Sequence, residues 1–170
     1  MIKGEMDREG DHPLVNRRPV RNPLDPVSKS IIEMLQVDGR RAYDSIAAEL
    51  GISEESVVQR VKQLTDSGVI QITAVSDPLQ LGFARQAMLG ITTERTLTKQ
   101  VAKSLADIPD VVYVVLTAGG FDILVEVVGE SDAHLLELVT AQIRPIAGVV
   151  SIHTFLYLEL EKQTYTWGVR

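Results

Sequence analysis

The spacing of apolar residues changes near the middle of the chain, and this change restricts the fold more than any other feature. Up to about residue 67 apolar residues recur at helical spacing, whereas beyond residue 84 short strand-like runs alternate with two helical runs. These runs predict strands at 85–93, 111–117, 121–128 and 149–161, and helices at 97–106 and 131–143. The β-α-β-β-α-β order is that of a ferredoxin-like domain, an antiparallel sheet with both helices on one face.

One face of such a sheet carries no helix. In the last predicted strand, Leu156, Leu158 and Leu160 alternate with Tyr157 and two glutamates. Because the sheet has apolar residues at alternating positions, we expect the uncovered face to be buried against another subunit.

Three helical runs precede the sheet domain. The first begins at Asp25-Pro26, a favourable N-cap followed by a residue suited to the first helical position. The second covers about 44–50 and the third about 54–67. Between them, Gly51 is placed to end one helix and Ser53 to cap the next. Two helices joined by a tight glycine turn are typical of a helix-turn-helix.

The third helix has a face suited to DNA. Val57, Val61 and Leu64 share one face and are expected to be buried. The opposite face carries side chains that can read base edges, with arginine recognising guanine and glutamine recognising adenine: Ser56, Gln59, Arg60 and Gln63. The candidate contacts to phosphates of double-stranded DNA, for which ordinary surface charge is the alternative, are Arg40, Arg41, Ser45 and Lys62.

The charge of the chain is unfavourable for DNA binding. The net charge is −6, and residues 25–76 carry five basic and eight acidic side chains. Glu54 and Glu55 stand at the start of the third helix, where they favour the helix dipole but repel phosphates. Since phosphate contacts supply much of the affinity for DNA, we expect oligomerisation to bring together more than one DNA-reading unit.

Together, the predicted helices and strands give an α+β fold class. A winged-type, three-helix helix-turn-helix domain, with a short strand at 69–75, is followed by the ferredoxin-like domain. The predicted parts are an irregular N-terminal arm (1–23), the helix-turn-helix domain (24–76), a linker (77–84), the ferredoxin-like domain (85–162) and a C-terminal tail (163–170). The arginines of the arm, Arg17, Arg18 and Arg21, either belong to a flexible tail or contact DNA.

Several classes of protein are not expected. There is no cysteine, and the three histidines, His12, His134 and His153, are too scattered to predict a metal site. No nucleophile–base pair or phosphate loop stands out, so we predict no catalytic residue and no cofactor. The chain has neither a secretory signal nor a run long enough to span a membrane, which favours the cytoplasm.

A glycine-rich turn joins the two central strands. Gly119-Gly120 could form a plain hairpin turn, because glycine adopts positive φ at little cost. Asp122 is harder to explain, since a carboxylate just inside an apolar strand needs a partner. That partner could be backbone N–H groups or the ammonium group of an amino-acid-like ligand.

In these features the chain resembles the Lrp/AsnC (feast/famine) family of transcriptional regulators. The resemblance covers about residues 24–162 and rests on several stretches together. These are Leu24-Asp25 with Ile31 and Leu35, Asp38-Gly39-Arg40, Ile46 through Ser53, Val57, Arg60-Val61, Leu64, Gly68-Val69-Ile70, Gly119-Gly120-Phe121-Asp122, and Gly148-Val149 with Thr154, Leu158 and Lys162.

The resemblance implies a homodimer built by packing of the C-terminal sheets, often assembled into octamers. It also implies a small effector, commonly an amino acid, bound between dimers near the glycine-rich turn. The effector-site residues implied in this way are Thr117, Gly119, Gly120, Asp122 and Thr154. The acidic segment after Ser53 and the ending Thr164–Gly168 depart from the family's pattern.

The leading hypothesis is a sequence-specific regulator whose assembly or operator affinity responds to a small effector. A sirohaem-decarboxylase-like enzyme is an alternative, because some of those enzymes share the two-domain layout. A ligand sensor that no longer binds DNA is a third interpretation, suggested by the acidic 25–76 segment.

Overall fold

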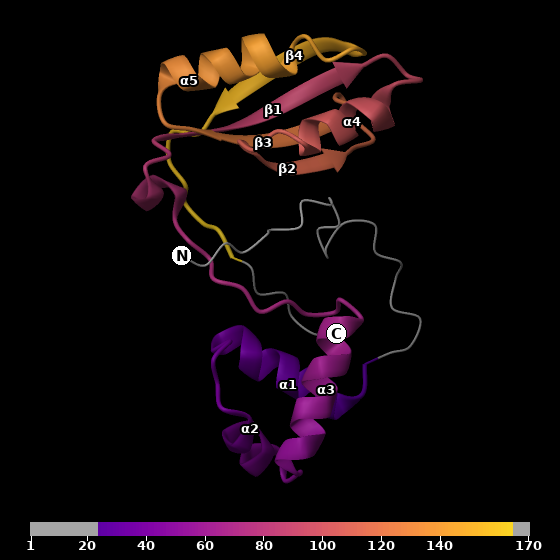
Figure 1. Ribbon diagram of the computed structural model, residues 1–170, viewed down its shortest axis with the longest axis vertical. Helices are drawn as coiled ribbons and strands as arrows, with labels where there is room; N and C mark the ends of the chain where they lie inside the picture. The colour runs from indigo at the N-terminus through magenta and orange to yellow at the C-terminus, as the bar shows by residue number, and fades with distance from the viewer. Residues whose placement is uncertain (1–23, 165–170) are drawn as a thin grey trace, which may run out of the picture. The chain divides into compact units, whose positions relative to one another are not determined.

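The computed structural model describes residues 24–164, which divide into two compact units (Figure 1). The described residues up to Ala74 include three helices and form what we call the helical unit. Residues Val75–Gln163 form the sheet unit. The predictions for the arm (1–23) and for residues 165–170 lie outside the described part of the chain.

The helical unit is held together by a small apolar core. Its helices are α1 (Pro26–Val37), α2 (Tyr43–Leu50) and α3 (Glu54–Asp66). Gly51 ends α2 in the left-handed conformation with φ 66°, and the Ser53 hydroxyl accepts the Ser56 N–H at 3.2 Å, as predicted for this turn. The buried core residues are Ile31, Leu35, Ile46, Ala47, Val57 and Val61.

A polar cluster ties the start of α1 to α3. The Asp25 carboxylate accepts the Ser28 hydroxyl at 2.7 Å and Arg60 Nη1 at 2.8 Å, and it caps α1 through the Val27 and Ser28 N–H groups. Arg60 Nη1 also donates to the Ser28 hydroxyl at 3.0 Å. These contacts lower the pKa of Asp25 to about 2, and the hydrogen bond from the Ser28 hydroxyl is the largest cause. Burial raises the pKa of this carboxyl, whereas the bonds from the Ser28 N–H and Arg60 lower it further.

The sheet unit has the predicted ferredoxin-like topology. Its strands are β1 (Arg85–Thr93), β2 (Val111–Leu116), β3 (Ile123–Gly129) and β4 (Val149–Leu156). They pair antiparallel in the order β2-β3-β1-β4. Helix α4 (Thr98–Ala106) follows β1, and α5 (Asp132–Glu137) continues into a π-helical turn, η2 (Leu138–Ile143), before β4. The predicted linker contains a short 3-10 helix, η1 (Pro78–Leu81).

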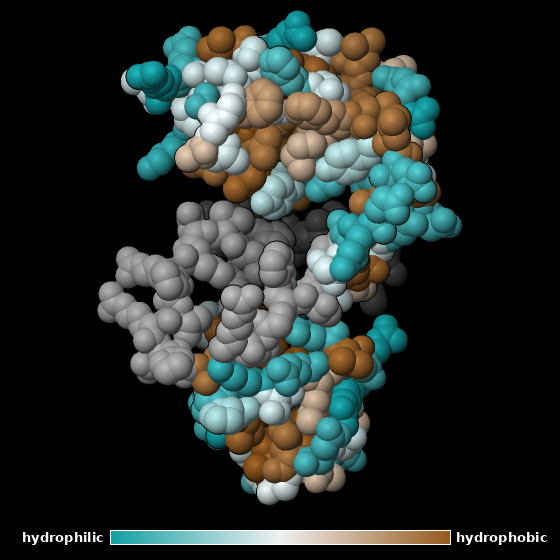
Figure 2. Space-filling model, turned by 180° about the vertical axis from the view of Figure 1, so that it is seen from behind, coloured by the Kyte–Doolittle hydropathy of each residue, from teal (hydrophilic) through white to brown (hydrophobic). Residues whose placement is uncertain are grey.

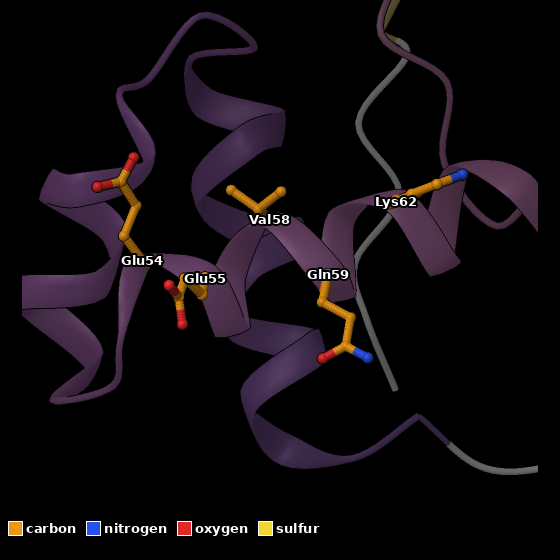
Figure 3. A pocket seen from close by; sticks show the side chains of 5 residues that line it. All are labelled: Glu54, Glu55, Val58, Gln59 and Lys62. Atoms are coloured by element: carbon orange, nitrogen blue, oxygen red, sulfur yellow. The ribbon is translucent and has the colours of Figure 1, made fainter.

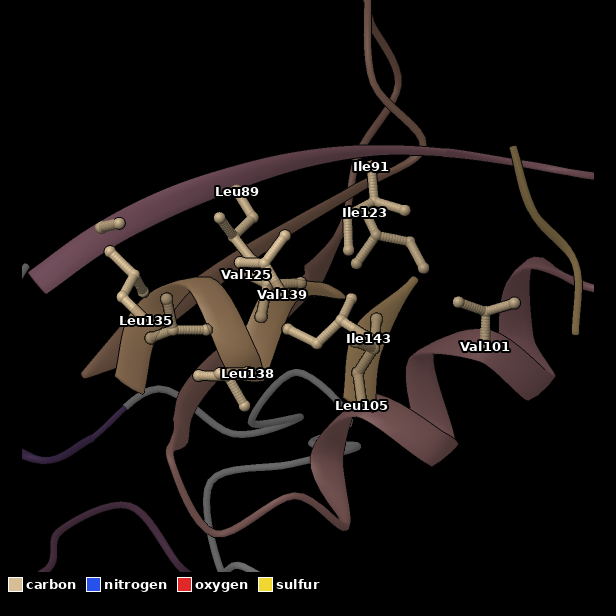
Figure 4. Close-up of a cluster of buried hydrophobic side chains, with 12 residues drawn as sticks. Leu89, Ile91, Val101, Leu105, Ile123, Val125, Leu135, Leu138, Val139 and Ile143 are labelled. Atoms are coloured by element: carbon tan, nitrogen blue, oxygen red, sulfur yellow. The ribbon is translucent and has the colours of Figure 1, made fainter. Parts of the chain in front are cut away.

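The core of the sheet unit lies between one face of the sheet and the two helices (Figure 4). Alternate residues of β1 and β3 point toward the helices, as the period of a strand requires. The fully buried residues are Ala87, Leu89, Ile91, Val101, Leu105, Ile123, Val125, Val127, Leu138 and Ile143. The helices therefore occupy one face and leave the other, where Tyr113 and Phe155 are each 50% exposed.

Two predicted strands are wrong in whole or in part. Residues 69–75 form no strand, because Val69 and Ile70 donate back to the Leu64 carbonyl and the described chain offers this segment no strand to pair with. The last strand ends at Leu156 and not at residue 161. The bond from Tyr157 N–H to the Gln86 carbonyl lies near the start of β1, which leaves Leu158 without a paired strand and 93% exposed.

The first testable prediction concerns Gly148. Gly148 has a φ of 97°, and a Cβ there would lie 2.7 Å from Leu97 Cβ. Gly82 has nearly the same φ, 95°, with nothing within 4 Å of a Cβ. Gly82→Ala should cost about 1–2 kcal/mol from left-handed strain alone, and Gly148→Ala should cost about 1–3 kcal/mol more because of the clash. Urea unfolding of the full chain measures both, and equal losses would contradict the packing at Gly148.

The second prediction concerns the pH dependence of the Asp25 cluster. Asp25→Ala should lower the free energy of unfolding by about 1 kcal/mol at pH 7, because the cap of α1 is lost. The folded-state pKa of about 2 lies below the ordinary value of 3.8. The stabilisation is therefore fully present above about pH 5 and is lost as the pH falls toward 2.

Urea unfolding followed by circular dichroism at pH 7 and pH 3 measures this effect. The difference between wild type and Asp25→Ala should be smaller at pH 3. Glu33→Ala, which removes an exposed carboxylate from the same helix, is the matched control. A difference for Asp25→Ala that is unchanged at pH 3 would show that the depressed pKa of Asp25 does not contribute.

Candidate DNA-reading and effector-binding sites

The outward face of α3 is the candidate DNA-reading surface. Gln59 and Gln63 are exposed on it, and Ser56 is half-buried. An open hollow on α3 is lined by Glu54, Glu55, Val58, Gln59 and Lys62 (Figure 3). Two of the four predicted base contacts, both glutamines, thus have free access to solvent.

The basic residues of the helical unit are mostly paired with carboxylates. Arg41 bonds to Glu49, and Lys62 bonds to Asp66 at 2.7 Å. Arg60, which was predicted to read a base, donates through Nη1 to Asp25 and Ser28. Arg40 and Ser45 are exposed on the surface of the unit. Contact with phosphates would therefore require Arg41 and Lys62 to exchange one anionic partner for another.

Two residues of the exposed α3 surface are not among the predicted DNA contacts. Val58 is 44% exposed although it is apolar, and Glu55 lies one helical turn before Gln59. From the sequence, Glu55 is interpreted through the helix dipole and its repulsion of phosphates, and no role is predicted for Val58. Helical spacing was the available signal, because Val58 lies 100° around the helix from buried Val57 and so cannot share its face.

At the glycine-rich turn, Asp122 has backbone and hydroxyl partners. Its Oδ2 accepts the Thr93 N–H at 2.7 Å and the Thr93 hydroxyl at 3.3 Å. The Thr93 hydroxyl in turn lies 2.7 Å from that of Thr98 at the start of α4. The Asp122 carboxylate therefore joins the end of β1 to α4, and its Oδ1 takes no part in these bonds.

The turn itself is closed by Thr117. The Thr117 N–H donates to the Asp122 carbonyl at 2.9 Å, and the Thr117 hydroxyl donates to the Phe121 carbonyl. Neither Gly119 nor Gly120 has a positive φ, so the interpretation of this pair as a positive-φ hairpin turn is wrong. A Cβ at either glycine would meet nothing within 4 Å, and the loop is open to solvent.

The structure brings together four of the five predicted effector residues. Thr117, Gly119, Gly120 and Asp122 lie in one turn, whereas Thr154 lies on β4 opposite Leu89. Leu89 precedes Thr93, the partner of Asp122, by four residues along β1. Within one subunit, Thr154 is therefore separated from the turn along the sheet.

An aromatic cluster on the uncovered face of the sheet was also missed. The Phe121 ring lies over Gly90, where a Cβ would come within 2.7 Å of the ring. The ring centroid of Phe121 is 5.3 Å from His153 and 6.0 Å from Phe155. His153 and Phe155 alternate in β4, and their pairing with Gly90 and Met88 could not be read from the sequence without the register.

Other kinds of site find no support in the described chain. Between residues 24 and 164, no group of three or more histidine, aspartate or glutamate side chains is placed to hold a metal ion. No helix in that range is both long and apolar enough to cross a membrane.

Comparison with known proteins supports a two-part assignment. Residues 24–65 match the AsnC-type helix-turn-helix domain, and residues 86–167 match the Lrp/AsnC ligand binding domain. The chain is 33% identical to the HTH-type transcriptional regulator FL11 of Pyrococcus horikoshii over 146 residues, which is 85% of this chain and 96% of that protein. It is 30% identical to the regulator LrpA of the same organism, over 80% of this chain and 97% of that protein.

Solved structures show the same fold. E. coli AsnC aligns with a TM-score of 0.78 at 23% identity, over 85% of this chain and 99% of that one. A transcriptional regulator of Neisseria meningitidis, solved as an L-Met complex, aligns with a TM-score of 0.77 at 22% identity, over 85% of this chain and 96% of that one.

These matches decide between the functional classes that the sequence left open. The relatives are transcriptional regulators and not enzymes, which counts against the sirohaem-decarboxylase interpretation. The helix-turn-helix match counts against a sensor without DNA binding. The chain belongs to the Lrp/AsnC family of transcriptional regulators, with a DNA-binding AsnC-type helix-turn-helix followed by a ligand-binding domain.

Proposed function

We propose that the protein is a homo-oligomeric, sequence-specific regulator whose operator affinity responds to an amino acid or a related metabolite in the cytoplasm. The observation that carries the DNA part is the exposure of Gln59 and Gln63 on the outward face of α3. Glutamine amides can bond adenine N6 and N7 in the major groove, so these two side chains supply sequence reading.

The remaining residues of the proposed interface contact the DNA phosphates or lie at the edge of the base-reading surface. Arg60 reaches DNA through the guanidinium nitrogens that are not bonded to Asp25 and Ser28, next to Ser56. Phosphates are contacted by Arg40, Arg41, Ser45 and Lys62. Because Arg41 and Lys62 are each paired with a carboxylate, phosphate binding replaces an existing ion pair, and the gain in affinity is modest.

The uncovered face of the sheet supports assembly. Phe121, His153 and Phe155 gather on it, and Tyr113 is half exposed at its edge. Seen from behind, the sheet unit shows hydrophobic side chains at its surface (Figure 2). Exposed apolar patches of this kind are typical of interaction surfaces, and a second copy of the same sheet is the occupant we propose. Assembly of dimers into an octamer is a further part of the proposal.

For the effector site we propose the turn formed by Thr117, Gly119, Gly120 and Asp122. The Oδ1 atom of Asp122 remains available to the ammonium group of an amino acid while Oδ2 holds Thr93. The open loop at Gly119-Gly120 lets a ligand approach the backbone closely. Thr154 contributes to this pocket only from another subunit, in agreement with a site between dimers.

Selection of bound duplexes from a random DNA library tests the DNA part. We expect a palindromic motif with half-sites about 10 base pairs apart, because a twofold dimer presents two recognition helices one helical turn apart. The double variant Gln59→Ala, Gln63→Ala should bind the selected operator at least about tenfold more weakly, since each bidentate contact contributes about 1–3 kcal/mol. Gln142→Ala, at an exposed glutamine of the sheet unit, is the control. Recovery of no motif at low or moderate salt would refute sequence-specific binding.

Titration calorimetry with the common amino acids tests the effector part. The amino acid that binds the wild type should bind Asp122→Asn at least about tenfold more weakly, because the ammonium group loses its charged partner. The asparagine oxygen can still accept the Thr93 N–H, so the fold should be retained. Asp107→Asn, with the same charge change at an exposed aspartate after α4, should bind like the wild type. Unaltered binding by Asp122→Asn would remove Asp122 from the site.

A further inference from the structure

We propose that Glu55 and Val58, together with the two glutamines of α3, form the base-reading surface, and that each operator half-site contains a cytosine read by Glu55 and a thymine methyl contacted by Val58. The proposal rests on the DNA-binding function above and adds the base chemistry of its reading surface. It follows from where α3 directs its exposed side chains.

Glu55, Gln59 and Gln63 form one ridge along α3. They follow one another at four-residue spacing, so each lies about one turn above the last on the same side of the helix. Figure 3 shows the side chains of Glu55 and Gln59 pointing the same way. All three are exposed, and the ridge lies opposite the buried residues Val57 and Val61. A surface that reads bases through Gln59 therefore also presents the Glu55 carboxylate.

The chemistry of this ridge selects particular bases. A carboxylate only accepts hydrogen bonds, and the cytosine N4 amino group is the donor that glutamate accepts in the major groove. At the same position guanine presents only acceptors, thymine presents an acceptor and a methyl group, and adenine places its N7 acceptor beside its N6 donor, so cytosine matches the carboxylate best. Glu55 thus weakens binding to every sequence that lacks the donor, which raises specificity more than affinity.

Val58 supplies an apolar contact beside this ridge. It is 44% exposed, and it lines the same hollow as Glu55 and Gln59. The thymine C5 methyl is the apolar feature of the major groove that a side chain of this type can contact. Burial of the Val58 methyl groups against thymine contributes a part of the affinity that does not depend on charge.

The pairing of the cations supports this assignment. In the helical unit Arg60 bonds to Asp25, Lys62 to Asp66 and Arg41 to Glu49. With those charges partly engaged, the groups that the exposed α3 surface offers are mainly carboxylate, amide and methyl groups, beside the ammonium group of Lys62. The bases that the groups of this surface contact are therefore expected to be cytosine, adenine and thymine.

The test compares operators selected by the wild type and by single variants of the full chain. Glu55→Gln should change the preferred base at one position of each half-site from cytosine to adenine, since glutamine recognises adenine, and Glu55→Ala should lose the preference. Glu33→Gln is the matched control, with the same charge change at an exposed glutamate of α1, outside the α3 surface. It should select the wild-type motif.

Chemical substitution of the operator tests Val58. Replacing one thymine of each half-site with uracil removes only the methyl group and should weaken wild-type binding about fourfold per half-site. Val58→Ala, which keeps only the Cβ methyl, should lose less affinity than the wild type when thymine is replaced with uracil. Circular dichroism of each variant verifies that the exposed substitutions leave the fold intact.

The outcomes separate this inference from the function on which it rests. A wild-type motif that Glu55→Gln and Glu55→Ala both leave unchanged overturns the role of Glu55. A loss on uracil substitution that is equally large in Val58→Ala overturns the role of Val58. Recovery of no motif by the wild type refutes sequence-specific binding itself.

Discussion

The sheet unit depends on the alternation of side chains along β1, one of the two strands that are paired on both sides. Its odd-numbered residues from Ala87 to Thr93 are buried, on the helix-covered face. Because the period of a strand is two, the intervening residues must face the other way. Gly90 is one of these, and the absence of a side chain there admits the Phe121 ring. The same register that builds the core therefore builds the uncovered face.

The glycine-rich turn connects the two faces of the sheet. Phe121 packs on Gly90 among the aromatic residues of the uncovered face, whereas its neighbour Asp122 bonds Thr93, which contacts Thr98 of α4. A ligand that bound the Asp122 carboxylate would compete with or reinforce a bond one residue away from the proposed subunit interface. In the proposed function, this adjacency would give a physical route by which effector binding changes assembly, since both proposed sites share one short segment.

The sequence was sufficient for the elements whose signals are local. Caps at Asp25 and Ser53, the turn at Gly51 and the order of strands and helices all follow from side-chain chemistry and spacing. The sequence was insufficient where the structure depends on a partner that is distant in the chain. Residues 69–75 have the composition of a strand but nothing to pair with among the described residues, and β4 ends near the start of β1. The partner of Arg60, 35 positions away, was equally beyond a local reading.

The net charge of −6 is compatible with DNA binding that depends little on phosphate contacts. A regulator with many free basic residues would bind any DNA, because phosphate contacts carry no sequence information. Here Arg41, Arg60 and Lys62 each bond to a carboxylate. The free energy gained from a new contact with phosphate is therefore offset by the loss of an existing ion pair. We therefore propose that affinity comes from base contacts on α3 and from joining several such helices in one assembly. In the function that we propose, weak single contacts combined in an oligomer would make binding steeply dependent on assembly, and an effector bound between subunits would control DNA binding through that assembly.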